Sequence, residues 1–244
     1  MIEIEGLVKT YEGFTAVDEL SLRVTEGEIL GLVGPNGAGK TTTLRCLSGI
    51  IPYTAGRIRI CGFDLQEQPI EARRRLAFVA DEPHLFEHLT VSDHMTLFGR
   101  IYGVADAAAK ARRLLEENDL VDQLHAFPGE LSRGMKQKLI ISCALLHEPR
   151  VLIFDEPLTG LDPASMRRTK RTITKTAAAG ATVIVSSHML HLVEAVCDRI
   201  LILQHGQKIL EGTLQEIRAS LPDLSGEADL EEIFLRATGH EEED

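Results

Sequence analysis

The stretch EILGLVGPNGAGKT, residues 28–41, decides the fold of this 244-residue chain. Its apolar first half has the pattern of a buried strand, and the helical pattern TTTLRCLSG (41–49) follows its glycine-rich second half. The loop between them, GPNGAGKT (34–41), matches G-x-x-x-x-G-K-[ST] in full, a pattern in which backbone N–H groups cradle phosphates at a helix N-terminus. Strand, loop and helix together predict a nucleotide-binding α/β domain.

Each residue type in this phosphate loop has a chemical reason to be there. The three glycines permit backbone torsions and close approaches that a Cβ atom would block. Lys40 can reach the β- and γ-phosphates and assist catalysis, and the Thr41 hydroxyl can ligate Mg²⁺. A glycine-rich turn without a ligand is the alternative, but it does not explain the flanking strand and helix. We therefore expect a nucleotide to contact the following residues: Gly34, Pro35, Asn36, Gly37, Ala38, Gly39, Lys40, Thr41 and Thr42.

Further apolar runs alternate with helical patterns along the chain. They are LAFVA (76–80), VLIFDE (151–156), ATVIVSS (181–187) and RILILQHG (199–206). This alternation is typical of an α/β fold with a mostly parallel sheet. The opening segments MIEIEGLVKTY (1–11) and SLRVTEGE (21–28) alternate apolar and polar residues more strictly, which predicts an N-terminal antiparallel β layer.

Helical patterns replace strands between LAFVA and VLIFDE. Residues 92–102 and 106–118 have the composition of helices, the first with Ser92 as its N-cap. The segment GMKQKLIISCALLHEP (134–149) continues as a helix up to Pro149. An inserted helical subdomain is the simplest interpretation.

We therefore treat the chain as a single domain over 1–244. Its parts are a nucleotide-binding α/β core (1–83 and 150–217), a helical subdomain (84–149), and a C-terminal part (218–244) with a short helix in DLEEIFLRATG (229–239) and an acidic tail, EEED (241–244).

Composition limits the classes of function. The formal net charge of −11 argues against nucleic acid as the main ligand, because a phosphate backbone calls for a basic surface. No apolar stretch approaches the roughly 20 residues that cross a bilayer, and the N-terminus lacks the pattern of a signal peptide. A membrane would therefore be reached through a partner. The cysteines show neither C-x-x-C pairing nor zinc-like spacing, so we expect reduced thiols.

Polar residues follow several of the apolar runs, at the edge of the sheet where ligands bind in α/β folds. Asp155 and Glu156 follow one run, His188 follows another, and Asp81 follows a third. Asp155 is suited to hold Mg²⁺ together with Thr41. Glu156 could orient or deprotonate an attacking water, and His188 could donate to a phosphate oxygen. Alone, the acidic pair could simply cap a loop, and the histidine could be a packing residue.

A second helix start, LSRGMKQKL (131–139), presents the hydroxyl of Ser132 and the glycine Gly134 to a possible anion. Together with GPNGAGKT, VLIFDEP, TGLDP and SSH, in this order and spacing, it resembles the ATP-binding cassette (ABC) ATPases over nearly the whole chain. GMKQ and LEEIFLRATG are similar to the exporter branch of the ABC transporter ATP-binding subunits. We call residues 131–139 the signature segment.

The resemblance implies a P-loop NTPase (RecA-like) core, together with a set of partners and roles. Two cassettes, as a homodimer or a heterodimer, would pair head to tail, so that Ser132 and Gly134 of one contact the ATP held by the other. Tyr11 would stack on adenine, although core packing is the alternative for this residue. Asp162, in TGLDP, would lie at the subunit interface and link the two sites.

The implied function is ATP hydrolysis, with Mg²⁺, coupled to transport by separate membrane permease subunits. Export is the direction that the resemblance implies. The cassette would lie on the cytoplasmic face of the cell membrane, touching the permease through the helical subdomain and residues 81–90. In one departure from the family, Asp81 and then Glu82 stand where it usually has glutamine. A carboxylate at 81 could ligate Mg²⁺ but, when ionised, could not donate a hydrogen bond.

Other readings remain open at this point. One is a soluble ABC ATPase of DNA repair or translation, although the chain has neither a second cassette nor a long coiled coil. Another is a nucleotide-binding regulator with little turnover, against which Glu156 and His188 argue. A GTPase or a small-molecule kinase would leave the signature segment unexplained.

Overall fold

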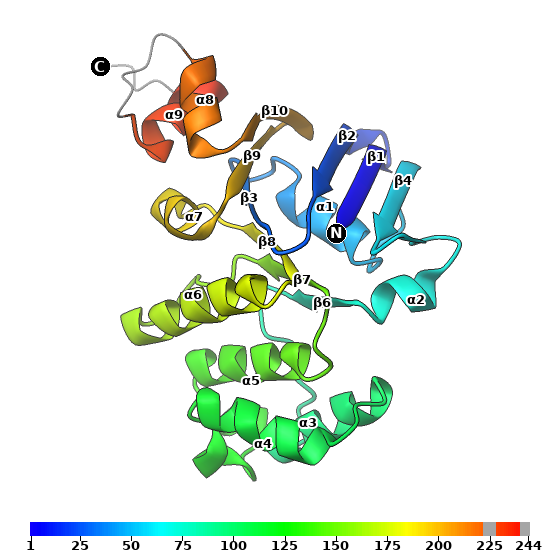
Figure 1. The fold of residues 1–244 in the computed structure, drawn as a ribbon, viewed down its shortest axis with the longest axis vertical. Coiled ribbons are helices and arrows are strands. Elements are labelled where there is room, and N and C mark those ends of the chain that lie inside the picture. Colours follow the sequence, from blue (N-terminus) through cyan, green and yellow to red (C-terminus); the bar gives the residue numbers. More distant parts are fainter. Residues whose placement is uncertain (222–227, 240–244) are drawn as a thin grey trace.

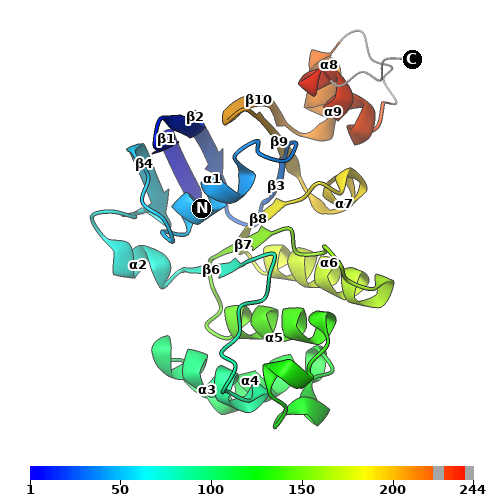
Figure 2. The ribbon, with the colours of Figure 1, turned by 180° about the vertical axis from the view of Figure 1, so that it is seen from behind.

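Two sheets and the helices around them make up the computed structural model, which describes residues 1–221 and 228–239 (Figures 1 and 2). The strands are β1 (Ile2–Tyr11), β2 (Phe14–Val24), β3 (Ile29–Val33), β4 (Ala55–Ile60), β5 (Phe63–Asp64), β6 (Leu76–Val79), β7 (Val151–Asp155), β8 (Thr182–Ser186), β9 (Arg199–Gln204) and β10 (Gln207–Gly212). The helices are α1 (Lys40–Leu47), α2 (Pro69–Arg73), α3 (Val91–Ile101), α4 (Ala107–Glu117), α5 (Arg133–Leu145), α6 (Pro163–Ala178), α7 (Leu190–Val196), α8 (Leu214–Ser220) and α9 (Leu230–Thr238), with short 3₁₀ turns at Val121–Gln123 and Pro128–Glu130. The predicted acidic tail, 241–244, lies outside the described residues.

The larger sheet has the strand order β10-β9-β3-β8-β7-β6. Strands β9, β3, β8, β7 and β6 run parallel, and β10 pairs antiparallel with β9 at one edge. All five predicted strands of this sheet are confirmed, whereas β10 was not anticipated. Every residue of β3, β7 and β8 is buried, which explains why these strands read as continuous apolar runs: helices or the second sheet cover both faces.

The second sheet, β2-β1-β4-β5, is antiparallel and confirms the predicted N-terminal β layer. It stands beside α1 over one face of the larger sheet (Figure 1). Ile4 and Leu20 from this layer, Leu44 from α1, and Leu30 and Leu201 from the larger sheet belong to one buried cluster. This packing fixes the β1–β2 hairpin beside the start of α1, where the phosphate loop ends.

The helical subdomain lies at one end of the molecule and is built from α3, α4 and α5 (Figure 1). The chain leaves the larger sheet after β6 and returns to it at β7. The three helices enclose a core of their own, which includes Val91, Met95, Leu115, Leu139 and Cys143. The predicted inserted helical subdomain is confirmed.

Two predicted helix ends are wrong. Thr90, not Ser92, caps α3, because its hydroxyl accepts from the Asp93 N–H while the Asp93 carboxylate accepts from the Thr90 N–H. This reciprocal capping box satisfies two open donors at once. Helix α5 ends at Leu145, short of Pro149, and Glu148 has a φ of 53°, outside the right-handed helical region.

The C-terminal helices α8 and α9 lie at the opposite end from the helical subdomain (Figure 2). Ile217, Leu230 and Ile233 pack against Val33 of β3 and Ile202 of β9. Asp229 caps the start of α9, and Gly239 ends it in a left-handed conformation. No helix within 1–221 and 228–239 has the combination of length and hydrophobicity that crossing a bilayer requires.

The packing around β7 can be tested by replacing Phe154, the largest fully buried side chain among the described residues. Phe154 is 0% exposed in β7. We expect Phe154→Ala to lower the free energy of unfolding by about 3–5 kcal/mol, because a cavity remains where the ring was. Urea denaturation measures the change. Phe14→Ala, at a position 65% exposed, is the matched control and should cost less than about 0.5 kcal/mol. Equal losses at the two positions would contradict the assignment.

Candidate nucleotide site

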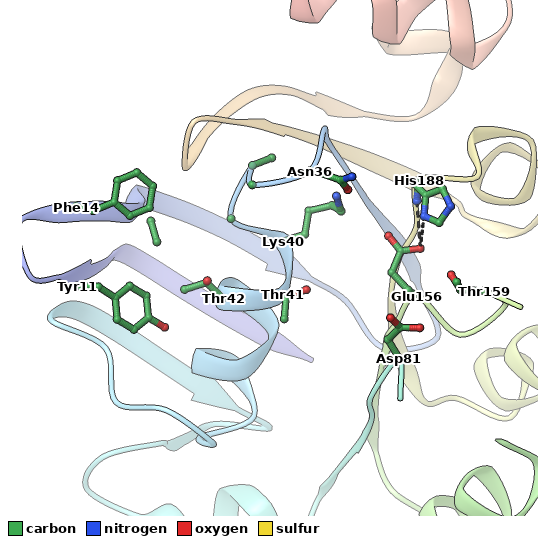
Figure 3. A pocket seen from close by; sticks show the side chains of 14 residues that line it. Tyr11, Phe14, Asn36, Lys40, Thr41, Thr42, Asp81, Glu156, Thr159 and His188 are labelled. Carbon is green, nitrogen blue, oxygen red and sulfur yellow. Dashed lines mark hydrogen bonds and ion pairs between the residues drawn. The ribbon is translucent and has the colours of Figure 1, made fainter. Parts of the chain in front are cut away.

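A cavity of about 510 Å³ lies between the phosphate loop, the β1–β2 hairpin and the loops that follow β6, β7 and β8 (Figure 3). We call it the nucleotide cavity. Its lining residues are Tyr11, Phe14, Ala16, Asn36, Gly37, Ala38, Gly39, Lys40, Thr41, Thr42, Asp81, Glu156, Thr159 and His188. Most of the residues predicted from the phosphate loop and the strand ends therefore share one cavity, while Gly34, Pro35 and Asp155 lie outside its lining.

The glycines let the phosphate loop pass close to other backbone segments. A Cβ atom at Gly34 would lie 2.3 Å from the Leu203 carbonyl oxygen, and one at Gly39 would lie 2.4 Å from the Ala16 carbonyl oxygen. Gly39 also has a φ of 101°. Only glycine avoids both the clash and the strain there. The loop therefore leads into α1 with its N-terminal N–H groups uncapped by any side chain.

Lys40 is buried at the first position of α1. Its ammonium donates to the carbonyl oxygens of Gly34, at 2.7 Å, and Pro35, at 3.2 Å. Burial lowers the pKa of Lys40, and the nearby carboxylates of Glu156 and Asp155 oppose that shift. The charge is held at the mouth of the loop, where a phosphate group would complete its coordination.

Asp155 ends β7 and is almost fully buried. Its Oδ1 accepts hydrogen bonds from Ser186 Oγ at 2.7 Å and from Thr41 Oγ1 at 3.2 Å. A carboxylate and a hydroxyl this close offer the oxygen ligands that Mg²⁺ prefers. The described residues contain no group of three or more His, Cys, Asp or Glu side chains that could hold a metal by themselves. The arrangement thus fits an ion that takes its other ligands from phosphate oxygens and water.

Glu156 and His188 form a pair on one side of the nucleotide cavity (Figure 3). His188 Nδ1 lies 2.8 Å from Glu156 Oε2, and the His188 N–H donates to the same oxygen at 3.3 Å. Glu156 has a φ of 48°, and its N–H donates to Ser186 Oγ at 3.0 Å. If Nδ1 carries the proton that bridges to Glu156, Nε2 of a neutral ring is an acceptor. His188 can then donate through Nε2 only as an imidazolium.

Asp81 enters the cavity from the loop after β6. One of its oxygens, Oδ1, is buried without a hydrogen-bond partner and lies 3.5 Å from Arg133 Nη2. Burial raises the pKa of Asp81, while the Arg133 guanidinium opposes the shift. The structure thus places the predicted metal-binding Asp81 at the cavity and also gives it a cationic neighbour from the signature segment.

Tyr11 and Phe14 form an aromatic wall on the side of the cavity away from Glu156 (Figure 3). They pair across the β1–β2 hairpin, and the two residues between them, Glu12 and Gly13, both have positive φ. Lys9 Nζ lies 4.5 Å from the Tyr11 ring centroid. Sequence reasoning missed Phe14, although Gly13 between two alternating segments could have indicated a hairpin turn, and such a turn places its flanking residues side by side. Thr159 was missed as well.

The remaining predicted residues gather elsewhere. Ser132 and Asp162 are exposed, and neither they nor Gly134 line the nucleotide cavity. A Cβ atom at Gly134 would lie 3.7 Å from Asp162 Oδ2, so the signature segment meets the start of α6. Ser132 caps α5 by accepting from the Met135 N–H, and Asp162 caps α6 by accepting from the Ala164 and Ser165 N–H groups. They form a second group on the surface.

Comparisons with known proteins agree with this geometry. A family model described as "ABC transporter" matches residues 17–159. The Nod factor export ATP-binding protein I of Paraburkholderia xenovorans is 40% identical over 221 residues, which cover 90% of this chain and 73% of that protein. The linearmycin resistance ATP-binding protein LnrL of Bacillus subtilis is 35% identical, covering 91% of this chain and 72% of that protein.

Solved structures share the fold. An ATP-binding subunit of an ABC transporter superposes with a TM-score of 0.91 at 34% identity, covering 97% of this chain and 99% of that one. A dimeric ATP-binding cassette in a post-hydrolysis state, bound to ADP and Pi, superposes with a TM-score of 0.80 at 24% identity, covering 88% and 99%. At that identity the second match supports the fold alone.

If Tyr11 and Phe14 contact the base, their loss should weaken the binding only of a ligand that has a base. Tyr11→Ala and Phe14→Ala should each weaken ATP binding by about 1–3 kcal/mol, the range for loss of one base–aromatic stack. Binding of inorganic tripolyphosphate should not change, because it has no base. Titration calorimetry with both ligands measures the difference. Phe127→Ala, at another partly exposed phenylalanine, is the control. Equal losses for ATP and tripolyphosphate would show that the wall supports the loop and not the base.

Proposed function

The chain belongs to the ABC transporter family, and from this premise we propose how its residues bind and hydrolyse ATP. It is an ATP-binding subunit of an ABC transporter and an ATPase. The observation that carries the proposal is the nucleotide cavity itself. It joins an open phosphate loop to the Glu156–His188 pair, 2.8 Å apart, while the signature segment lies outside it.

The nucleotide cavity supplies the groups that phosphoryl transfer needs. Lys40 and the loop N–H groups bind the β- and γ-phosphates, and Tyr11 and Phe14 hold the base. Thr41 and Asp155, joined at 3.2 Å, would hold Mg²⁺, with Asp81 as a further candidate ligand. When bound, Mg²⁺ would neutralise charge on the phosphate oxygens. The protein's contribution is then positioning and charge stabilisation.

Glu156 is the residue that we assign to the attacking water. Its carboxylate reaches into the nucleotide cavity and can orient the water or accept its proton. In the described arrangement His188 occupies one carboxylate oxygen. A water placed between Glu156 and a γ-phosphate therefore has to share or displace that contact. His188 would then be free to donate to a phosphate oxygen.

Two copies would complete each other's sites. Ser132 and Gly134 lie at the start of α5, outside the lining of the nucleotide cavity of their own chain. The N-terminus of a helix, with N–H groups and a hydroxyl, is suited to a triphosphate. The triphosphate it meets would then belong to a second cassette, identical or related. Asp162, beside Gly134, would lie at that interface.

The partner in the membrane would be a separate permease subunit. Residues 81–90 connect the nucleotide cavity to the helical subdomain, and Phe86 in that segment is 55% exposed. We assign this exposed ring to a contact with a cytoplasmic helix of the membrane protein. We place the cassette on the cytoplasmic face of the membrane. Export is the proposed direction, since several similar proteins are named for Nod factor export. Their names give no support to the DNA-repair alternative.

Glu156→Gln should separate binding from hydrolysis. The amide keeps the shape but cannot accept a proton, so we expect ATP affinity within about two-fold of wild type and turnover at least about a hundred-fold lower. Phosphate release and equilibrium binding measure the two quantities. Glu87→Gln, an exposed glutamate outside the cavity lining, should leave both unchanged. Wild-type turnover in Glu156→Gln would refute the role assigned to Glu156.

Mixing two inactive variants should test whether the site is shared. Lys40→Ala removes the phosphate loop's cation, and Ser132→Glu places a negative charge in the signature segment. If the sites are shared, a mixed dimer keeps one site with both parts intact. At equal mixing, activity should return to about a quarter of wild type, as random pairing in a two-fold dimer predicts. Activity that stays at the level of the separate variants would contradict a shared site.

A further inference from the structure

Arg133 reaches from the helical subdomain to the core of its own chain. It is the first residue of α5, between Ser132 and Gly134, and its Nη2 lies 3.5 Å from Asp81 Oδ1. Asp81 follows β6 and lines the nucleotide cavity. The ion pair therefore joins the signature segment, which the proposed dimer directs at the partner's nucleotide, to the cavity that holds the chain's own nucleotide.

The Arg133 guanidinium packs against Gly160. A Cβ atom at Gly160 would lie 2.9 Å from Arg133 Cζ and 2.9 Å from Nη1, so the guanidinium lies directly over this glycine. Gly160 has a φ of 70° and belongs to the loop between β7 and α6, next to the cavity-lining Thr159. Arg133 thus contacts the two core loops that flank the nucleotide cavity. A larger residue at position 160 would push it away.

The charges around the cavity explain why the contact between Asp81 and Arg133 is favourable. Asp81, Asp155 and Glu156 contribute three carboxylates near the phosphate loop, and Asp155 and Glu82 both act against the negative charge of Asp81. Among the described residues, Asp81 has a single ion-pair partner, Arg133. Its buried Oδ1 has no hydrogen bond. An uncompensated carboxylate in this place would be unfavourable, so the attraction to Arg133 holds the start of α5 against the core.

We propose that Arg133 is a positioning residue, whose contacts with Asp81 and Gly160 fix the signature segment relative to the chain's own nucleotide cavity. Through this link the loop beside one nucleotide sets the orientation of the helix start that serves the other. The inference rests on the proposed function, because it gives Arg133 a part in the dimer. It differs from a direct contact between Arg133 and the partner's triphosphate, which would not need Asp81.

Hydrogen–deuterium exchange of the full chain without nucleotide tests the link. Arg133→Gln and Asp81→Asn should each speed amide exchange over residues 131–136 by about two- to five-fold, the range that a half-exposed ion pair allows. The double variant should exchange no faster than either single variant, because each substitution breaks the same contact. Unchanged exchange in Arg133→Gln, or additive effects in the double variant, would overturn the proposal.

A second ion pair between the same two parts of the chain provides the control. Arg168 of α6 pairs with Asp119, just beyond α4, and also donates to the Glu117 carbonyl oxygen. Arg168→Gln loosens the helical subdomain without touching Asp81. It should speed exchange near residues 117–120 and leave residues 131–136 unchanged. Faster exchange over 131–136 in Arg168→Gln, equal to that in Arg133→Gln, would reduce Arg133 to a general tether and overturn its specific role.

ATP-dependent dimer formation supplies the functional measurement. In the Glu156→Gln background, Arg133→Gln and Asp81→Asn should each raise the ATP concentration needed for half-maximal dimer by about two- to five-fold, again without additivity. Size-exclusion chromatography with light scattering reports it. Additive shifts would overturn the proposal. A Glu156→Gln chain that forms no dimer with ATP would instead refute the proposed function, while the exchange experiment would still decide on the Arg133–Asp81 link.

Discussion

The parallel alignment of β3, β8, β7 and β6 is the constraint on which the site depends. Backbone hydrogen bonds in register bring segments that are more than a hundred residues apart in the chain to one edge of the sheet. Because parallel strands end on the same side, the phosphate loop, Asp81, Glu156 and His188 meet there although they lie far apart in the sequence. The antiparallel layer packs over one face of this sheet and thereby brings Tyr11 to the site.

The sequence predicts this edge well because its signals are local or follow from strand direction. Five buried runs become the five parallel strands, and the polar residues after them converge as strand polarity requires. What it could not predict depends on the third dimension. The contact between Arg133 and Gly160 joins two segments that no sequence pattern links. Thr90 replaces Ser92 as a cap because the reciprocal bond with Asp93 outweighs a single hydroxyl. The position of Phe14 beside Tyr11 could have been predicted from the hairpin turn between them.

The separation of the predicted residues into two groups accounts for how such a subunit would work. One group lines the nucleotide cavity, and the other, around Gly134 and Asp162, faces outward. Under the proposed function, a cassette alone would bind ATP but leave part of the triphosphate uncovered. Hydrolysis would wait for a second copy, which links turnover to a large relative motion of two bodies.

The placement of α8 and α9 has a practical consequence. They pack on β9 and β3, at the far end of the molecule from α3, α4 and α5 (Figure 1). A fluorophore or a surface anchor on an exposed position of α9, such as Glu231, would therefore sit remote from the face that we assign to the permease. Immobilised in this way, the cassette would keep its helical subdomain turned outward, available to a membrane protein in detergent or in a nanodisc.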